Sequence, residues 1–172
     1  VEFSGYGPII PMHDAATNGQ VSSVQILGKT RTNLLPPLDE WTNATNGKGV
    51  IIDDYTVEID NVGGGWNRYE FTFDVNEGDV YSGNCVYMNG GIVYLSFYDE
   101  LGEELSKFGV PFEDVTVPSN AKTATFHLHA NNYDGVVSFK NPILEKAETY
   151  GNFITGTKST IAAMKIKSVG KN

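Results

Sequence analysis

The sequence predicts an all-β protein, an antiparallel two-sheet β-sandwich of the jelly-roll type. Aromatic and β-branched residues recur in short runs in which apolar and polar positions alternate. Clusters of Gly, Asn, Asp and Pro interrupt these runs roughly every 8 to 15 residues, as turns do in such sandwiches. No segment shows the spacing of an amphipathic helix, and 172 residues are enough to bury one core.

Four strands are expected in the first half of the body, at residues 55–60, 69–75, 80–88 and 92–98. In the first of them apolar and polar residues alternate strictly from Tyr55 to Asp60, which is typical of a half-buried strand. Residues 76–79 and 89–91 are rich in Asn and Gly and are the expected turns between these strands.

The second half of the body continues this pattern with one interruption. Residues 99–104 are the expected tip of a hairpin, and a less regular stretch follows through Pro111. Further strands are expected at 125–131, 136–141 and 143–145, with Pro142 indicating an edge or a bend. Seven or eight strands with mostly hairpin-like connections between residues 33 and 149 fit a two-sheet jelly roll.

Composition excludes several functional classes. The 21 acidic residues outnumber the 12 Lys and Arg, and the net charge of −9 argues against a nucleic-acid partner. No apolar run approaches the roughly 18 residues that a membrane helix needs, so no membrane partner is expected. Cys85 is the only cysteine, which excludes an internal disulfide and a cysteine-rich zinc site. The motifs of metalloproteases, serine hydrolases and nucleotide sites are missing, and Gly63–Gly65 predicts a turn.

The two ends differ from the body and resemble each other. A strand-like segment, then Gly-Lys, then Asn occurs in residues 24–33 and again in 164–172. We therefore expect an N-terminal extension with a linker strand at 1–31, a module at 32–149, and a linker strand at 150–172 leading to another module. Residues 161–167 are expected to pair with 21–27 at an edge. The start at Val1 indicates a processed product or a piece of a longer protein.

The order of several short motifs carries a resemblance. Thr-Asn-Leu-Leu-Pro at 32–36, Tyr-Asp-Glu-Leu-Gly at 98–102 and Asn-Pro-Ile-Leu-Glu at 141–145 follow one another at the right places. Residues 32–149 resemble the carbohydrate-binding-module-like (family 4/9-type, galactose-binding-like) jelly rolls of phage and prophage tail or tail-fibre minor structural proteins. Residues 3–17 and 21–28 resemble the connecting strands before such modules.

This resemblance implies a place in the virion tail, outside the cell, and adhesion to carbohydrate of the host cell surface. The implied partners are a bacterial surface or cell-wall glycan, other tail modules, and further copies of the chain in a fibre. Two alternatives stay open. In the first, the chain is a purely structural spacer of the tail. In the second, it is the accessory module of a secreted polysaccharide hydrolase.

Trp66 is the first candidate ligand residue. It follows three glycines and precedes Asn67 and Arg68, so an aromatic ring stands beside an amide and a guanidinium. Sugars stack their C–H faces on such rings while amides and guanidinium groups bind the hydroxyls. The alternative is that Trp66 plugs the open end of the sandwich. Trp41 belongs to the opening motif, and we expect it to pack in the core.

His127 and His129 share one face of the strand at 125–131. Their spacing suits a metal, but a third ligand is not evident, so an exposed or sheet-covering pair is expected. If that face is concave, both histidines line a groove with Tyr87 and bind a glycan together with residues of the next turn: Asn131, Asn132 and Tyr133. Otherwise those last three are turn residues.

Glycosidases need two carboxylates that flank the cleaved bond. The candidates, which lie at turns or on polar strand faces, are Asp53, Asp54, Glu70, Asp99, Glu103 and Glu104. Solvation keeps the pKa of such carboxylates in its usual range, so no enzyme activity and no catalytic residue are expected. No cofactor is expected either. A structural Ca²⁺ is known in jelly rolls of this type, but no DxDxDG spacing supports one, and the sequence leaves the question of a metal open.

Overall fold

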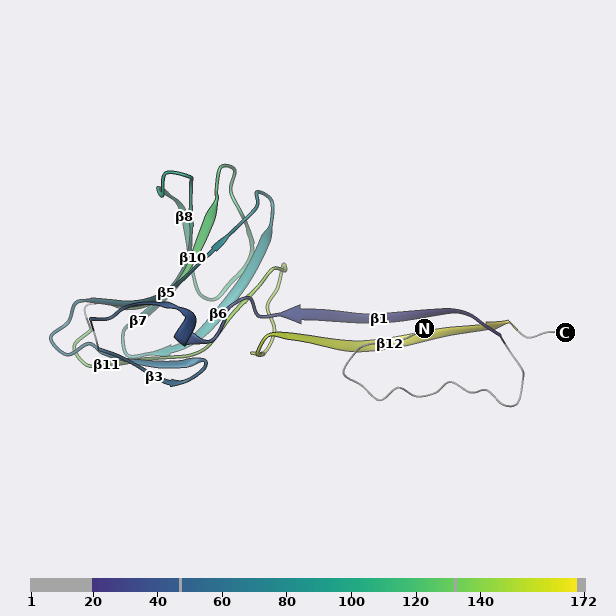
Figure 1. Cartoon of the computed structure of the whole chain (residues 1–172), viewed down its shortest axis with the longest axis horizontal. Coiled ribbons are helices and arrows are strands. Elements are labelled where there is room, and N and C mark those ends of the chain that lie inside the picture. Colours follow the sequence, from purple (N-terminus) through teal and green to yellow (C-terminus); the bar gives the residue numbers. More distant parts are fainter. Residues whose placement is uncertain (1–19, 47, 132, 170–172) are drawn as a thin grey trace. The chain divides into compact units, whose positions relative to one another are not determined.

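A computed structural model describes residues 20–46, 48–131 and 133–169 (Figure 1). The chain divides into two units, residues 1–31 with 157–172, and residues 32–156. In the first unit, β1 (Gln20–Thr32) and β12 (Thr157–Val169) form a two-stranded sheet, the pairing that the sequence predicts for 21–27 and 161–167. The resemblance noted for residues 3–17 lies outside the described residues.

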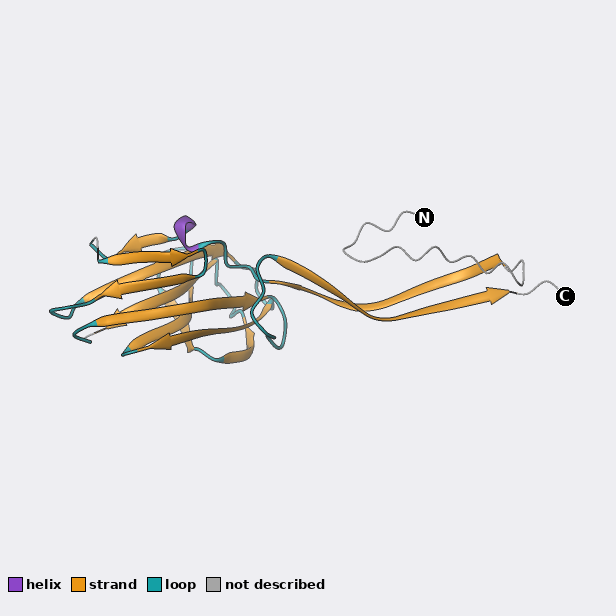
Figure 2. Ribbon diagram, turned by 90° about the horizontal axis from the view of Figure 1, so that it is seen from below, coloured by secondary structure: helices purple, strands orange, loops and turns teal. Residues whose placement is uncertain are grey.

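The second unit is an antiparallel two-sheet β-sandwich, as predicted (Figure 2). The sheet named here the β10 sheet has the order β2 (Thr42–Ala44), β5 (Trp66–Asp74), β10 (Thr123–Asn131), β7 (Gly91–Tyr98) and β8 (Glu104–Gly109). The β11 sheet has the order β3 (Gly49–Asp53), β4 (Thr56–Asp60), β11 (Val136–Glu145), β6 (Val80–Met88) and β9 (Phe112–Thr116). A single 3-10 turn, η1 (Leu38–Glu40), is the only helical element among the described residues.

The strand pairing is that of a jelly roll. β4 pairs with β11, β5 with β10, β6 with β9, and β7 with β8, all antiparallel. These nested pairs are what results when one long hairpin, β4–β7 against β8–β11, winds into two facing sheets. β2 and β3 then add one edge strand to each sheet.

Because of this winding, the connections between strands differ from those that the sequence predicts. Residues 76–79 and 89–90 link strands of different sheets, so they are not hairpin turns as the sequence analysis assumed. In the described sandwich, hairpins join only β3 to β4 and β7 to β8. The tip at 99–103 is correct, and Asp99 Oδ1 accepts hydrogen bonds there from the backbone N–H groups of Leu101 and Glu103. The less regular stretch contains two strands, β8 and β9.

The core lies between the sheets and is rich in aromatic side chains. Trp41 is buried, with its ring 5.9 Å from that of Phe71 and 6.1 Å from that of Phe126. Its indole N–H donates to the carbonyl of Pro36 at 3.0 Å, so the buried ring keeps its polar group paired. The packing role predicted for Trp41 is confirmed.

Asn33 joins the beginning and the end of the sandwich. Its buried side-chain amide donates to the carbonyls of Pro142 and Ile154, and its Oδ1 accepts from the N–H groups of Leu35 and Leu144. The Asn33 backbone N–H also donates to Gly156. The Asn-Leu-Leu and Asn-Pro-Ile-Leu-Glu motifs are therefore in direct contact in this fold.

Pro142 marks a bend, as predicted, but inside a central strand. β11 continues from Val136 to Glu145, and its pairing with β6 shifts between Lys140 and Ile143. The strand is thus one element with a β-bulge, which accommodates a proline without breaking the sheet.

Candidate functional site

A glycine-rich turn delivers the chain to the first candidate residue. Gly63, Gly64 and Gly65 have φ angles of 82°, 68° and 121°, a region that side chains with a Cβ disfavour. The Gly63 N–H donates to Asp134 Oδ1 at 2.8 Å, and the Gly64 N–H donates to the Asn61 carbonyl. The predicted turn is confirmed, and β5 begins directly after it.

Trp66, the first residue of β5, is an exposed ring. Its side chain is among the exposed large hydrophobic groups, at 62% relative exposure. The only ring next to it among the described residues is that of His129, at 4.7 Å and an interplanar angle of 47°. The interpretation of Trp66 as a core plug is therefore wrong.

Strand register places five predicted ligand residues on the outer face of the β10 sheet. Asn131 lies opposite Trp66, His129 opposite Arg68, and His127 opposite Glu70. Alternate residues of neighbouring strands point to the same face, so these side chains form one surface. We call its outermost part the Trp66 patch, made of Trp66, Arg68, His129 and Asn131.

Glu70 organises the surface beside the patch. Its Oε1 lies 2.7 Å from Arg68 Nε and 2.9 Å from His127 Nδ1. The His127 ring stacks on Tyr94 at 4.3 Å, and its Nε2 lies 3.4 Å from the Tyr98 hydroxyl. Burial lowers the pKa of His127 to about 4, although Glu70 acts to raise it. The neutral ring therefore has Nδ1 against the Glu70 carboxylate and Nε2 within reach of the Tyr98 hydroxyl.

His129 is also buried and neutral. Burial lowers its pKa first, and the charges of Arg68 and Lys107 lower it further. Three buried polar atoms of the patch, Arg68 Nε, His129 Nε2 and Asn131 Oδ1, make no hydrogen bond to a described residue, although Arg68 Nε forms the ion pair with Glu70. The histidine pair covers its sheet but is not exposed, because Tyr94 and Trp66 lie over it.

The other predicted ligand residues lie elsewhere. Asn67 points inward, buried, and its side-chain amide donates to Asn61 Oδ1, while the Asn61 amide donates to the Tyr133 carbonyl. Tyr133 packs against the core and closely against Gly90, so both residues shape the loops. Tyr87 belongs to β6 in the β11 sheet and cannot line a groove with the histidines, so that prediction is wrong. Asn132 lies outside the described residues.

β7 and β8 also contribute to this surface, which the sequence did not predict. Tyr94 lies opposite His127, and Lys107 Nζ sits 3.6 Å from the centre of the Tyr94 ring. Ile92 lies opposite His129 and is an exposed apolar neighbour of the patch. Alternation along residues 92–98 places Tyr94 and Tyr98 on one face, but nothing in the sequence indicates that this strand adjoins β10.

Besides Glu70, three of the six candidate carboxylates have local partners. Asp53 accepts from the N–H of Tyr55, Asp99 from its own hairpin tip, and Glu104 from the Ser96 hydroxyl at 2.8 Å. Across the described residues, no group of three His, Cys, Asp or Glu side chains is placed to hold a metal ion. No helix in the described part of the chain is long and apolar enough to cross a membrane.

No family model matches this chain, and no curated protein matches it. Among solved structures it is similar to the enzymatically active domain of bacteriophage CBA120 tailspike protein 4, with 12% identity and a TM-score of 0.42 over 73% of this chain and 19% of that chain. The accessory secretory proteins 1, 2 and 3 of Streptococcus pneumoniae give 17% identity and 0.43, over 62% and 85% of the two chains.

The carbohydrate-binding module TmCBM61, solved with β-1,4-galactotriose, gives 14% identity and a TM-score of 0.35, over 73% of this chain and 90% of that chain. This chain therefore spans about a fifth of the tailspike chain and most of the module. At such identities and TM-scores, these similarities carry no argument about function.

Proposed function

We propose that residues 32–156 form a non-catalytic carbohydrate-binding module of a phage or prophage tail protein, which contacts glycan of the host cell surface through the Trp66 patch. The observation that carries this proposal is the exposed ring of Trp66, held at a strand end beside Arg68 and Asn131. An exposed aromatic ring beside a guanidinium and an amide offers a ligand both an apolar face and hydrogen-bonding groups.

The patch offers the two kinds of contact that a sugar uses. The Trp66 ring provides a face for C–H stacking, and the half-buried Arg68 provides hydrogen-bond donors. Because Glu70 contacts both Arg68 and His127, its role in this proposal is to position these two side chains and not to act as an acid or a base.

A few such contacts support only weak binding by one module. Repetition compensates, because copies in a tail fibre present many sites at a high effective concentration. The proposal accordingly includes homo-oligomers, neighbouring tail modules as partners, an extracellular or virion location, and no cofactor.

The test is retention on immobilised bacterial cell-wall polysaccharides, with the protein multimerised on a carrier. Trp66→Ala should abolish retention while the melting temperature stays nearly unchanged, since the ring contributes little to the core. Tyr87→Ala is the matched control, because it removes a half-exposed aromatic ring from the other sheet and should leave retention intact. Absence of retention by the multimerised wild type, or equal losses in both variants, contradicts the proposal.

A purely structural spacer is the second candidate, and the packing beside the patch favours it. His127, His129 and Tyr94 are all buried, so much of this face is closed by its own side chains. The same retention experiment separates the two functions, because a spacer binds no polysaccharide.

A further inference from the structure

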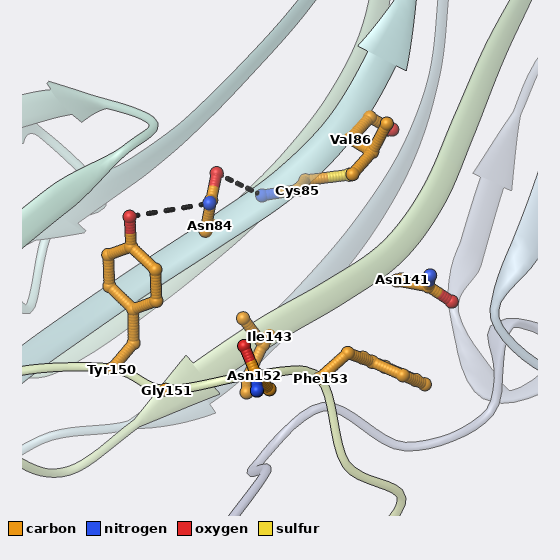
Figure 3. A pocket seen from close by; sticks show the side chains of 9 residues that line it. All are labelled: Asn84, Cys85, Val86, Asn141, Ile143, Tyr150, Gly151, Asn152 and Phe153. Carbon is orange, nitrogen blue, oxygen red and sulfur yellow. Dashed lines mark hydrogen bonds between the residues drawn. The ribbon is translucent and has the colours of Figure 1, made fainter.

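A cavity of about 210 Å³ lies on the β11 sheet, along the seam between β6 and β11 (Figure 3). It belongs to the sheet opposite the Trp66 patch. The residues that line it come from β6, from the bulge of β11 and from the segment at 150–153: Asn84, Cys85, Val86, Asn141, Ile143, Tyr150, Gly151, Asn152 and Phe153.

The bulge in β11 creates this space. Lys140 pairs with Val86 and Ile143 with Asn84, so two residues of β11 stand opposite the single residue Cys85. Asn141 has a φ angle of 52°, and its N–H donates to the Tyr55 carbonyl on the far side from β6. Pro142 has no N–H to donate. The β6–β11 ladder is thus open at this point, a feature that often lies next to binding sites.

The segment at 150–153 closes the space from one side and is itself anchored. The Asn84 side-chain amide donates to the Tyr150 hydroxyl at 3.3 Å, and Asn84 Oδ1 accepts from the Cys85 N–H at 2.8 Å (Figure 3). Phe153 packs edge-on against Tyr55, with ring centres 5.1 Å apart. Two contacts therefore hold the wall in place without a ligand, and a preformed site binds with a smaller entropic loss.

The lining has the chemistry of a site for a neutral polar molecule. None of its residues is Asp, Glu, Lys, Arg or His, whereas three of them carry side-chain amides. Burial raises the pKa of the Cys85 thiol to about 12, so it adds no charge. The exposed Asn141 side chain makes no hydrogen bond to any described residue, and the phenyl ring of Phe153 is close by.

We propose that this cavity binds one neutral sugar ring, or a polyol of the same size, through the Asn141 amide and the Phe153 ring. The volume sets the size, because sites for drug-sized ligands measure about 300 Å³ or more. This inference goes beyond the proposed function: it concerns another sheet and shares no residue with the Trp66 patch.

The experiment is a ¹H–¹⁵N NMR titration of the full chain with D-galactose, D-glucose and N-acetyl-D-glucosamine, and with D-glucuronate as the charged comparison. At least one neutral sugar should shift the amide signals of 141 and 150–153 with a Kd on the order of millimolar. No shift at these residues with any neutral sugar, or tighter binding of D-glucuronate, overturns the proposal.

Two variants identify the groups that bind. Asn141→Gly removes the amide and keeps the positive φ, and Phe153→Leu removes the flat ring and keeps an apolar side chain. Each should weaken binding by roughly tenfold, whereas Asn120→Gly, at another position with positive φ, should not change it. Unchanged binding in Asn141→Gly and Phe153→Leu overturns the proposal.

Trp66→Ala separates this site from the Trp66 patch. Shifts at 141 and 150–153 should persist in this variant even if retention on polysaccharide is lost. Shifts that appear only around Trp66 and disappear in Trp66→Ala overturn the cavity site and leave the proposed function standing.

Discussion

Two matching rows of side chains cross the outer faces of the two sheets. On the β10 sheet, the register from β2 to β7 gives the row Thr42, Glu70, His127 and Tyr94. On the β11 sheet, the register from β3 to β6 gives the row Val50, Glu58, Ser138 and Met88. Both rows hold a glutamate on the second strand and a polar residue on the central strand. We call the first row closed, because its residues on the third and fourth strands, His127 and Tyr94, are buried, and the second row open.

The difference is large at the fourth residue of the two rows. Tyr94 is 8% exposed and stacked on His127, whereas Met88 is 55% exposed. At the first residue both rows are alike, since Thr42 and Val50 are both exposed. Burial of an outward side chain therefore depends on the size and chemistry of its cross-strand neighbours. Tyr94 also has Gly109 of β8 beside it, whereas the pairing of β6 with β9 ends at Gly83 and does not reach Met88. The imidazole fills the space between Glu70 and Tyr94, which the short Ser138 side chain cannot do between Glu58 and Met88.

The largest expected effect on this difference is a loss of stability when the pH is lowered. The pKa of His127 is about 4 in the fold and 6.5 when unperturbed, so the unfolded chain takes up the proton first. The contribution of His127 is complete above pH 6.5 and is lost as the pH falls towards 4. This lowering of the His127 pKa corresponds to a loss of about 3 kcal/mol in the free energy of unfolding. Glu70, Arg68 and Lys107 are the charged groups that act on this ring.

Urea denaturation between pH 7 and 4 measures this effect. His127→Gln keeps a donor for Glu70 and does not titrate, so its stability should fall less steeply over the same range than that of the wild type. Parallel slopes for the two proteins would mean that His127 does not titrate as a buried neutral ring. The pKa of His129 is lowered as well, which leaves some slope in the variant.

The two glutamates test the rows directly. Glu70→Ala removes the carboxylate that lies against the buried His127 Nδ1 and pairs with Arg68, so it should cost about 2 kcal/mol. Glu58→Ala, at the same place in the open row, should change the free energy of unfolding by no more than about 0.5 kcal/mol. Equal losses in the two variants, measured by urea denaturation at pH 7, would remove the distinction between the faces.

The sequence predicted the strands whose residues alternate and the class of the fold, because period-two alternation is a local property. It did not predict the edge strands β2 and β3, so the sandwich has ten strands and not the seven or eight expected. It did not predict β8 and β9 either. Their segment surrounds Pro111, and β8 itself alternates weakly because Glu104, Leu105 and Lys107 are all exposed. It also assigned hairpins to the turns at 76–79 and 89–90, since a turn sequence does not indicate whether the chain stays in one sheet.

The candidate site was predicted in part for the same reason. Trp66, Arg68, His129 and Asn131 lie together because β5 and β10 are neighbours. Alternation already placed His129 and Asn131 on one face, whereas Trp66 and Arg68 precede the strand that the sequence predicts at 69–75. Tyr87 was misplaced, since strand order is a non-local property. The cavity at β11 was not foreseen, because it needs the bulge at Asn141 and the later segment at 150–153 together.

A smaller effect is expected from removing Lys107, whose ammonium group lies over the Tyr94 ring of the closed row. Lys107→Ala removes the cation above the Tyr94 ring and should cost about 0.5–1 kcal/mol, since the ammonium is exposed. Lys140→Ala is the matched control, because Lys140 is an exposed residue of the central strand on the other sheet. Thermal unfolding at pH 7 compares the two, and a loss in the control as large as that in Lys107→Ala would contradict the cation–π contribution.

The smallest effect is expected at the two ends of the open row. Val50→Thr and Met88→Thr replace side chains that keep more than half of their surface in water, so little apolar burial is lost. Threonine also suits a strand. Each change should alter the free energy of unfolding by less than about 0.5 kcal/mol, or roughly 1–2 °C in Tm. Tyr94→Thr, at the end of the closed row, removes a buried ring stacked on His127 and should cost several times more. A loss in Met88→Thr comparable with that in Tyr94→Thr would show that the face of the β11 sheet is as closely packed as that of the β10 sheet.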